Sequence, residues 1–203
     1  MTAVEVFADV SCPFTHVGLR RFVELREELD RPDVRLLVRA WPLEIVNGQP
    51  LDPAFIAEEV DDIRRQIAPT LFGGFTESAF PSSSLPALTL SAAAYEHDLA
   101  TGERISLALR DLLFEQGIDI ADSSVLTELA AEHGVTVDLG DSRPVLDDHA
   151  EGVSRGVVGS PHFFTPDGGF FCPALDVHRD ADGHLHISPD TAGFDSFVTA
   201  CFA

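Results

Sequence analysis

The chain opens with two short apolar runs separated by one amphipathic stretch, and this order constrains the fold more than any other feature. Residues 4–8 (VEVFA) are β-branched and aromatic, which predicts a strand followed by a turn at Ser11. From Phe14 onward, apolar residues recur at helical spacing until Pro32, and residues 34–40 (VRLLVRA) predict a second strand. A crossover of this length joins parallel neighbours, so the sequence predicts a βαβ unit.

The middle of the chain, from about Pro53 to about Arg155, carries amphipathic segments and no convincing strand. Each segment is bounded by Pro, Gly, Ser or Asp, as helix ends usually are. The segments cover residues 54–68, 85–100, 102–117, 123–134 and 143–157. Between the first two, residues 71–86 are rich in Gly, Ser and Pro. We interpret them as a loop with exposed aromatic side chains that serves as a lid or a partner surface.

Two hairpins and a helix are expected at the end of the chain. Residues 159–175 place two aromatic strands around the turn signal PDGG, and residues 177–187 suggest a second hairpin. A final helix is expected over residues 190–202. This order predicts an α/β protein with a thioredoxin-like fold and an all-helical insertion. We assign residues 1–52 and 142–203 to the thioredoxin-like domain and residues 53–141 to the helical insertion domain.

Charge and composition exclude several classes of function. The chain has 13 basic and 34 acidic residues and a formal charge of -21, so we expect neither a nucleic acid nor a membrane partner. Every basic residue is arginine, which excludes Schiff-base chemistry on a lysine. No apolar stretch approaches the ~20 residues of a membrane helix, and the first residues lack the features of a secretory signal. We therefore expect a cytoplasmic protein.

Three stretches together resemble one known family. EVFADVSCPFTHVGLRRF (residues 5–22) resembles the first strand and active-site helix of the DsbA-like thioredoxin-fold family, in particular its cytoplasmic FrnE-like branch. In that branch an acidic residue precedes a C-P-x-C motif. Residues 109–135 resemble the insertion helices of the branch, and GVVGSPHFF (residues 156–164) resembles its G-V-x-G-x-P loop. The resemblance implies a thioredoxin-like fold that handles thiols.

Cys12 is the candidate nucleophile. A thiol at a helix N-terminus faces unpaired backbone N–H groups and the positive end of the helix dipole, and both favour the thiolate. Pro13 in the first helical turn supports a helix start at this point. We therefore expect the pKa of Cys12 to lie well below the free value of ~8.5. The alternative is a buried thiol without a chemical role.

Thr15 stands where the family has its second cysteine, since the motif reads C-P-F-T. A hydroxyl cannot expel a thiolate from a mixed disulfide, although it can donate a hydrogen bond to the Cys12 thiolate. We therefore expect an external thiol, glutathione or mycothiol, as a co-substrate, and no permanently bound cofactor. A plain packing role for the threonine is the alternative.

A related branch carries S-P-[YF]-S at this position. It contains the kappa-class glutathione transferases and the 2-hydroxychromene-2-carboxylate isomerases, in which a serine hydroxyl orients the thiolate of bound glutathione. The motif of this chain keeps the cysteine of one branch in its first position and a hydroxyl in its last. Both resemblances imply a site that handles thiols.

The proline loop supplies the other candidate site residues. By resemblance, Pro161 follows a cis bond and faces Cys12, and the Ser160 backbone docks the substrate. His162 would begin the next strand and modulate the thiol, unless its side chain points away along the strand. The remaining candidate substrate-binding residues are Pro13, Phe14 and Trp41. Trp41 either lines the cleft or belongs to the core.

The remaining cysteines and histidines are weaker candidates. If PDGG closes a four-residue turn, Phe163 pairs with Cys172, two strand spacings of ~4.8 Å from Cys12 and beyond disulfide reach without movement. Cys172 is then a packed thiol with at most a secondary redox role, and Cys201 is a packing residue. The histidines near the second hairpin invite a metal interpretation, but no cysteine or matched carboxylate completes a set, so we expect no metal. They are His178, His184 and His186.

These observations favour a thiol-disulfide oxidoreductase of the reductase or isomerase type, with one active-site cysteine and an external thiol. Its partners are a small thiol or a protein disulfide, and a homodimer is compatible with the sequence. One alternative is a glutathione- or mycothiol-dependent isomerase or transferase of the hydroxychromene or kappa class. Another is a catalytically degenerate binding module that uses the loop at residues 71–86.

Overall fold

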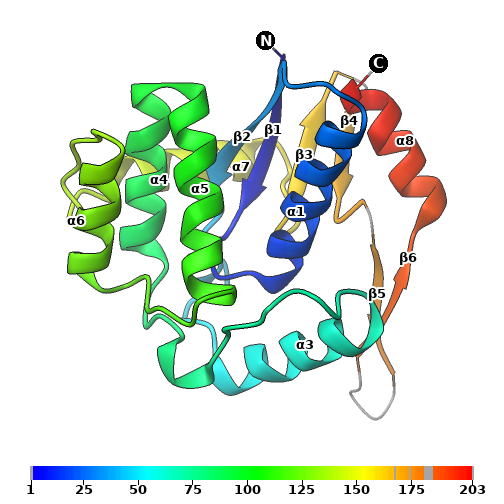
Figure 1. Cartoon of the computed structure of the whole chain (residues 1–203), viewed down its shortest axis with the longest axis horizontal. Helices are drawn as coiled ribbons and strands as arrows, with labels where there is room; N and C mark the ends of the chain where they lie inside the picture. The colour runs from blue at the N-terminus through cyan, green and yellow to red at the C-terminus, as the bar shows by residue number, and fades with distance from the viewer. Residues whose placement is uncertain (1, 167, 174, 181–184, 203) are drawn as a thin grey trace.

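The computed structural model describes residues 2–166, 168–173, 175–180 and 185–202 (Figure 1). Its centre is a four-stranded sheet in the order β2-β1-β3-β4, in which β1 pairs with β2 in parallel and the other pairs are antiparallel. The strands are β1 (Thr2–Ala8), β2 (Val34–Ala40), β3 (His162–Thr165) and β4 (Gly168–Phe171). The thioredoxin-like order expected from the sequence is thereby observed, together with the expected helical insertion.

Helix α1 (Pro13–Glu28) forms the crossover between β1 and β2. Cys12 is its N-cap and has an extended backbone, with φ -82° and ψ 116°. Pro13 occupies the first turn, where a missing N–H costs no helical hydrogen bond. The predicted βαβ unit is confirmed, and Cys12 lies where the carboxyl end of β1 turns into α1.

Between β2 and β3 the chain is helical in the segments that amphipathic periodicity predicts. Asp52, Asp98 and Asp122 cap three of these helices by accepting hydrogen bonds from backbone amides of the first turn. The elements are α2 (Leu43–Val46), α3 (Pro53–Gln66), η1 (Glu77–Ala79), α4 (Leu85–His97), α5 (Leu99–Phe114), α6 (Ser123–Glu132) and α7 (Arg143–Ser154). Only the short elements α2 and η1 were not expected.

The register of the β3–β4 hairpin differs from the one expected. Thr165 pairs with Gly168 and Phe163 with Phe170, so the turn spans two residues and not four. Gly168 has a φ of 138°, which an L side chain rarely adopts, and this conformation lets the second strand resume there. Cys172 therefore lies beyond β4 and does not pair with Phe163.

The second expected hairpin and the final helix are both present. β5 (Leu175–Arg179) and β6 (Leu185–Pro189) form a separate two-stranded sheet, and α8 (Thr191–Phe202) follows. The apolar side chains of this hairpin join the same cluster as those of α3. In Figure 1, α3 lies across the end of the central sheet at which α1 begins, and β5 and β6 lie beside one end of α3.

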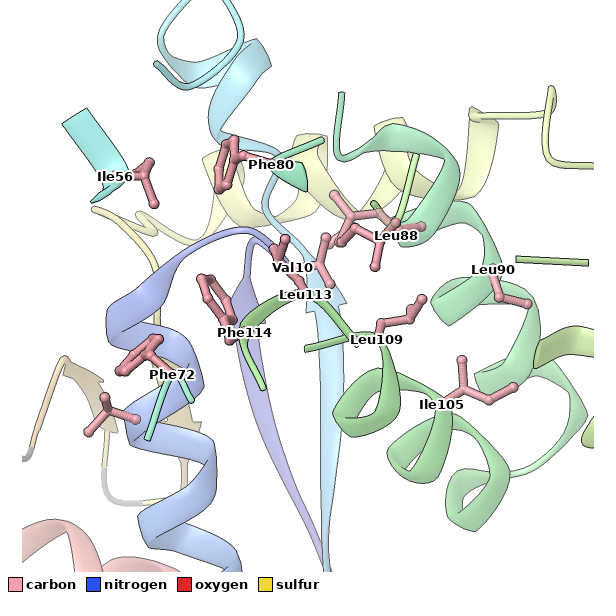
Figure 2. Close-up of a cluster of buried hydrophobic side chains, with 14 of the residues drawn as sticks. Val10, Ile56, Phe72, Phe80, Leu88, Leu90, Ile105, Leu109, Leu113 and Phe114 are labelled. Carbon is pink, nitrogen blue, oxygen red and sulfur yellow. The ribbon is translucent and has the colours of Figure 1, made fainter. Parts of the chain in front are cut away.

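The hydrophobic core has a large part within the helical block and smaller parts on the two faces of the sheet. Val10, in the turn before Cys12, packs into the helical part, as Figure 2 shows. Phe72 and Phe80 also lie in this cluster, with exposed fractions of 1% and 8%. The prediction of exposed aromatic side chains in the 71–86 loop is therefore wrong for these two residues, because their rings pack against other aromatic rings of the cluster.

No helix within the described residues is long and apolar enough to cross a membrane.

Candidate active site

The Cys12 thiol faces the loop that precedes β3. Its Sγ donates to the carbonyl oxygen of Ser160 at 3.3 Å, and the peptide bond between Ser160 and Pro161 is cis. Pro161 is buried, and its ring lies against Gly18 of α1. The structure thus brings together Cys12 and the proline loop, which are 148 residues apart in the sequence.

The thiol is shielded from solvent, with 4% of Cys12 exposed. Burial raises the pKa of Cys12, and hydrogen bonds from the Thr15 hydroxyl and amide and from Ser160 oppose this effect only in part. The negative charge of Glu59 on α3 raises it further. The prediction of a lowered pKa is therefore wrong for this conformation, because lost solvation outweighs the helix N-terminus.

Thr15 joins the motif to the proline loop through hydroxyl groups. Its Oγ1 lies 2.7 Å from the Oγ of Ser160, and that Oγ accepts a hydrogen bond from the Asp9 amide at 2.9 Å. The Thr15 side chain is fully buried. One hydroxyl pair therefore fixes the distance between α1 and the loop, and the Thr15 hydroxyl lies beside the thiol.

Asp9 anchors the turn that carries Cys12. Its buried carboxylate accepts hydrogen bonds from the amides of Ser11 and Leu43, each at 2.7 Å, and from the Ser84 hydroxyl at 3.1 Å. Burial raises the pKa of Asp9, while these donors and the charge of Arg110 lower it. Asp9 was not among the candidate site residues, although the acidic residue ahead of the motif is part of the family resemblance.

Arg110 of α5 lies beneath the same turn. One guanidinium nitrogen donates to the carbonyl oxygen of Asp9 at 3.2 Å, and another donates to Ser106. Burial lowers the pKa of Arg110 to about 10, and the charges of Tyr95, Asp9 and Cys12 oppose this effect. Sequence reasoning missed this residue, since an arginine inside an amphipathic helix has the same pattern as a solvent-facing one.

His162 is turned away from the thiol. It pairs across the sheet with Phe7, whose side chain packs on the α7 side with Trp41 and Val157. Its Nδ1 accepts a hydrogen bond from the Val158 amide at 3.2 Å, and its ring stacks on Phe164. Burial lowers the pKa of His162. The expectation that His162 modulates Cys12 finds no support in this placement, because alternation along β3 directs its side chain to the opposite face.

Trp41 belongs to the core and not to a cleft. It is 4% exposed, packs with Phe7 and Val157, and lies against Gly152 of α7. Its ring also packs on His149, with centroids 5.0 Å apart. The expectation that Trp41 binds substrate is therefore wrong for this structure, because α7 covers the residue.

The two motif residues after Cys12 are also mostly covered. Pro13 is buried at the start of α1, and Phe14 is half-buried against the core cluster shared by α3 and the β5–β6 hairpin. Cys172 follows β4, and its amide donates to the carbonyl oxygen of Pro161 at 3.0 Å. Burial raises the pKa of Cys172 to about 12, and the charge of Cys12 adds to this effect. Cys201 packs in the core, as expected.

The histidines of the second hairpin form ring and hydrogen-bond contacts. His178 stacks on His186, whose Nε2 lies 2.9 Å from Asp180, while His184 falls outside the described residues. In the part of the chain that the structure describes, no group of three or more metal-ligating side chains comes together.

The fold and the site define a thioredoxin-fold protein with a single cysteine in its helix-capping motif, facing a cis-prolyl loop. The chain belongs to the DSBA-like thioredoxin domain family, whose model matches residues 3–182.

Solved structures with the same fold share little sequence with this chain. A cytosolic disulfide reductase, DsbM from Pseudomonas aeruginosa, is 15% identical with a TM-score of 0.58, covering 97% of each chain. A putative protein disulfide isomerase from Nitrosomonas europaea is 14% identical with a TM-score of 0.62, again over 97% of each chain. A 2-hydroxychromene-2-carboxylate isomerase is 14% identical with a TM-score of 0.60, over 84% of this chain and 88% of the other. Among curated proteins no match was found.

Proposed function

We propose that the protein is a thiol-disulfide oxidoreductase of the reductase or isomerase type, in which Cys12 forms a mixed disulfide and an external thiol resolves it. The observation that carries this proposal is the contact between the Cys12 Sγ and the Ser160 carbonyl. It places the sulfur beside a backbone segment that an extended peptide or the cysteinyl part of a small thiol can pair with.

In the first step the Cys12 thiolate attacks one sulfur of a disulfide, forms a new S–S bond and releases the other sulfur as a thiolate. In the second step an external thiolate attacks the substrate sulfur of the mixed disulfide, which releases the Cys12 thiolate and leaves the substrate joined to the external thiol. A second external thiolate then attacks that disulfide and releases the remaining substrate thiolate. With glutathione as the thiol, two molecules are oxidised to one glutathione disulfide while the substrate disulfide is reduced to two thiols. The Thr15 hydroxyl cannot reduce a disulfide as a thiol can, so it serves only as a hydrogen-bond donor.

The proposal includes a glutathione-class co-substrate and a cytosolic site of action. A structure of DsbM from Pseudomonas aeruginosa is described as a cytosolic disulfide reductase with GSH, and its fold is the one seen in this chain. Mycothiol remains the alternative thiol. We also propose that residues 53–141 form an insertion domain, since α3 to α6 lie within that range.

A second candidate is a thiol-dependent isomerase or transferase. The burial of Cys12 and its raised pKa favour it, because a neutral S–H can donate a hydrogen bond to the thiolate of a bound small thiol without forming a covalent bond. The neighbouring hydroxyls of Thr15 and Ser160 are suited to the same task. The third interpretation, a binding module, loses part of its support because Phe72 and Phe80 are buried.

Intact-mass spectrometry after incubation with oxidised glutathione separates these functions. We expect one glutathione adduct on the wild type, none on Cys12→Ser, and an unchanged adduct on Cys172→Ser, the matched control for a second thiol near Pro161. An adduct that persists in Cys12→Ser would overturn the oxidoreductase proposal. Conjugating or isomerase activity that survives in Cys12→Ser would favour the second candidate.

A further inference from the structure

Arg110 is a buried cation without an ion pair among the described residues. It is 1% exposed, and its hydrogen bonds go to neutral oxygens. These are the carbonyl oxygen of Ser106 at 2.7 Å, the hydroxyl of Ser106 at 2.8 Å and the carbonyl oxygen of Asp9 at 3.2 Å. Its Nε has no partner in the structure. Burying a charge whose hydrogen bonds go only to neutral oxygens costs folding free energy. This cost suggests that the charge stabilises an anion nearby.

The groups that interact electrostatically with this guanidinium are Asp9, Tyr95, Asp111 and Cys12. Asp111 is bound to Arg20 on α1, and the Tyr95 hydroxyl donates to the carbonyl oxygen of Leu36. The Asp9 carboxylate is already held by three hydrogen-bond donors. The three donors to Asp9 are uncharged, so Arg110 is the cation that Asp9 and Cys12, at the two ends of one turn, share.

We propose that Arg110 is a positioning residue of the thiol site, whose guanidinium braces the Asp9–Cys12 turn and supplies the positive charge that the Cys12 thiolate needs. Because it concerns the ionisation of Cys12, this role rests on the proposed function above.

The hydrogen bonds explain how a residue of the insertion acts on the motif. Arg110 holds the carbonyl of Asp9, while the amide of the same residue donates to the Ser160 hydroxyl that contacts Thr15. The backbone of Asp9 thus connects the guanidinium to the hydroxyl pair beside the thiol. Loss of Arg110 is expected to act on Cys12 through both charge and position.

Glu59 on α3 has the opposite effect. Its side chain is 13% exposed and binds Arg179 of β5 at 2.9 Å, and its negative charge disfavours the Cys12 thiolate. Asp9 is a second negative charge near the site, and Cys172 is a neighbouring thiol held neutral by burial. One buried cation therefore opposes two carboxylates. Removing the cation should raise the pKa of Cys12, and removing a carboxylate should lower it.

The test is the rate of Cys12 alkylation by iodoacetamide from pH 6.5 to 9.5, followed by peptide mass spectrometry. For Arg110→Met we expect an apparent pKa of Cys12 higher by about one unit or more, seen as roughly tenfold slower alkylation at a fixed pH. Arg110→Lys keeps the charge, so its shift should be less than half as large. Glu59→Gln should accelerate alkylation. Arg143→Gln, which removes an exposed arginine at the start of α7, is the matched control and should change nothing.

An Arg110→Met protein that unfolds at the same urea concentration as the wild type but keeps the wild-type pKa of Cys12 would overturn the role. If Arg110→Met does not fold, the folded wild type still provides a test. The Arg110 Nε–H resonance in ¹H–¹⁵N NMR should shift as Cys12 titrates and stay constant in Cys12→Ser; a constant resonance in both proteins would contradict the proposal. Alkylation requires no disulfide, so these outcomes are independent of the glutathione adduct that tests the proposed function.

Discussion

Cys12 and Ser160 are joined by a hydrogen bond in which the thiol donates to a backbone carbonyl, with 3.3 Å between sulfur and oxygen. A donor must carry its proton, so this contact belongs to the neutral thiol. Burial raises the pKa of the same group. In this arrangement the sulfur is covered and the raised pKa favours its neutral form, so reaction requires both access and ionisation.

Replacing Thr15 by valine should slow the reaction of Cys12. The change removes the hydroxyl that contacts Ser160 and opposes the raised pKa of Cys12. We expect a higher thiol pKa, roughly tenfold slower alkylation at pH 7.5 and a loss of about 1–3 kcal/mol in unfolding free energy. Thr15→Ser keeps the hydroxyl and should restore most of the rate. Equal rates for the valine and serine variants would show that the hydroxyl has no such role.

Replacing Thr15 by cysteine should change the product of oxidation. A thiol at this position supplies the resolving nucleophile that the motif lacks. Incubation with oxidised glutathione should then give an intramolecular disulfide between positions 12 and 15 in place of a lasting glutathione adduct. Intact mass before and after iodoacetamide distinguishes the two products. A lasting adduct on Thr15→Cys would mean that the side chain at position 15 cannot reach the Cys12 sulfur.

The sequence predicted the helices and strands around the site better than the burial and the pKa of the thiol within it. Helical spacing and Pro13 located α1 and placed Cys12 at its start. The thiol pKa was predicted in the wrong direction, because a helix N-terminus is a local feature while burial depends on segments far away in the sequence, such as the proline loop that contacts the thiol. The β3–β4 register was wrong because one glycine conformation decides where the strand resumes.

Access to Cys12 should depend on how α3 is attached to the second hairpin. The Gln66 side chain donates to the carbonyl oxygen of Leu185 and accepts from the amide of Ile187, both at 2.9 Å, as a neighbouring strand would. Gln66→Ala leaves both backbone groups of β6 without this partner, and about tenfold faster alkylation of Cys12 is expected. Arg65→Ala, an exposed neighbour on the same helix, is the control. Unchanged alkylation in Gln66→Ala would show that this attachment does not limit access.

Acid should destabilise the fold through His16 and Glu115. Burial keeps His16 neutral by lowering its pKa from 6.5, and its Nε2 lies 2.7 Å from the Glu115 carboxylate. Burial disfavours the Glu115 charge, but hydrogen bonds from His16 and from the amides of Phe72 and Gly73 outweigh it and lower its pKa to about 2.

Both shifts have the same sign. The unfolded chain binds protons at a higher pH than the folded protein, so stability should fall below pH 6.5 as His16 protonates on unfolding. It should fall further between pH 4.5 and about 2, where the Glu115 contribution is lost. Urea unfolding followed by the fluorescence of Trp41, the single tryptophan, measures this. Glu115→Gln should flatten the lower part of the profile; a profile identical to that of the wild type would contradict the assignment.

A site residue could be predicted from the sequence when it lies in a local motif, and could not when tertiary packing alone places it. Cys12, Thr15, Ser160 and Pro161 lie in two short motifs, and the structure brings these motifs together. For His162 and Trp41 the sequence left two placements open: alternation along β3 directs His162 to the opposite face, and α7 covers Trp41. Arg110 carries no signal in the sequence, since its partner is a backbone carbonyl in another element.

The most direct test of the account is the steady-state reduction of 2-hydroxyethyl disulfide with excess glutathione, compared between the wild type and Cys12→Ser, with Cys172→Ser as the control. The account predicts turnover by the wild type and by Cys172→Ser, and none above the uncatalysed rate by Cys12→Ser. Turnover by Cys12→Ser at the wild-type rate would show that the Cys12 sulfur does not carry the reaction.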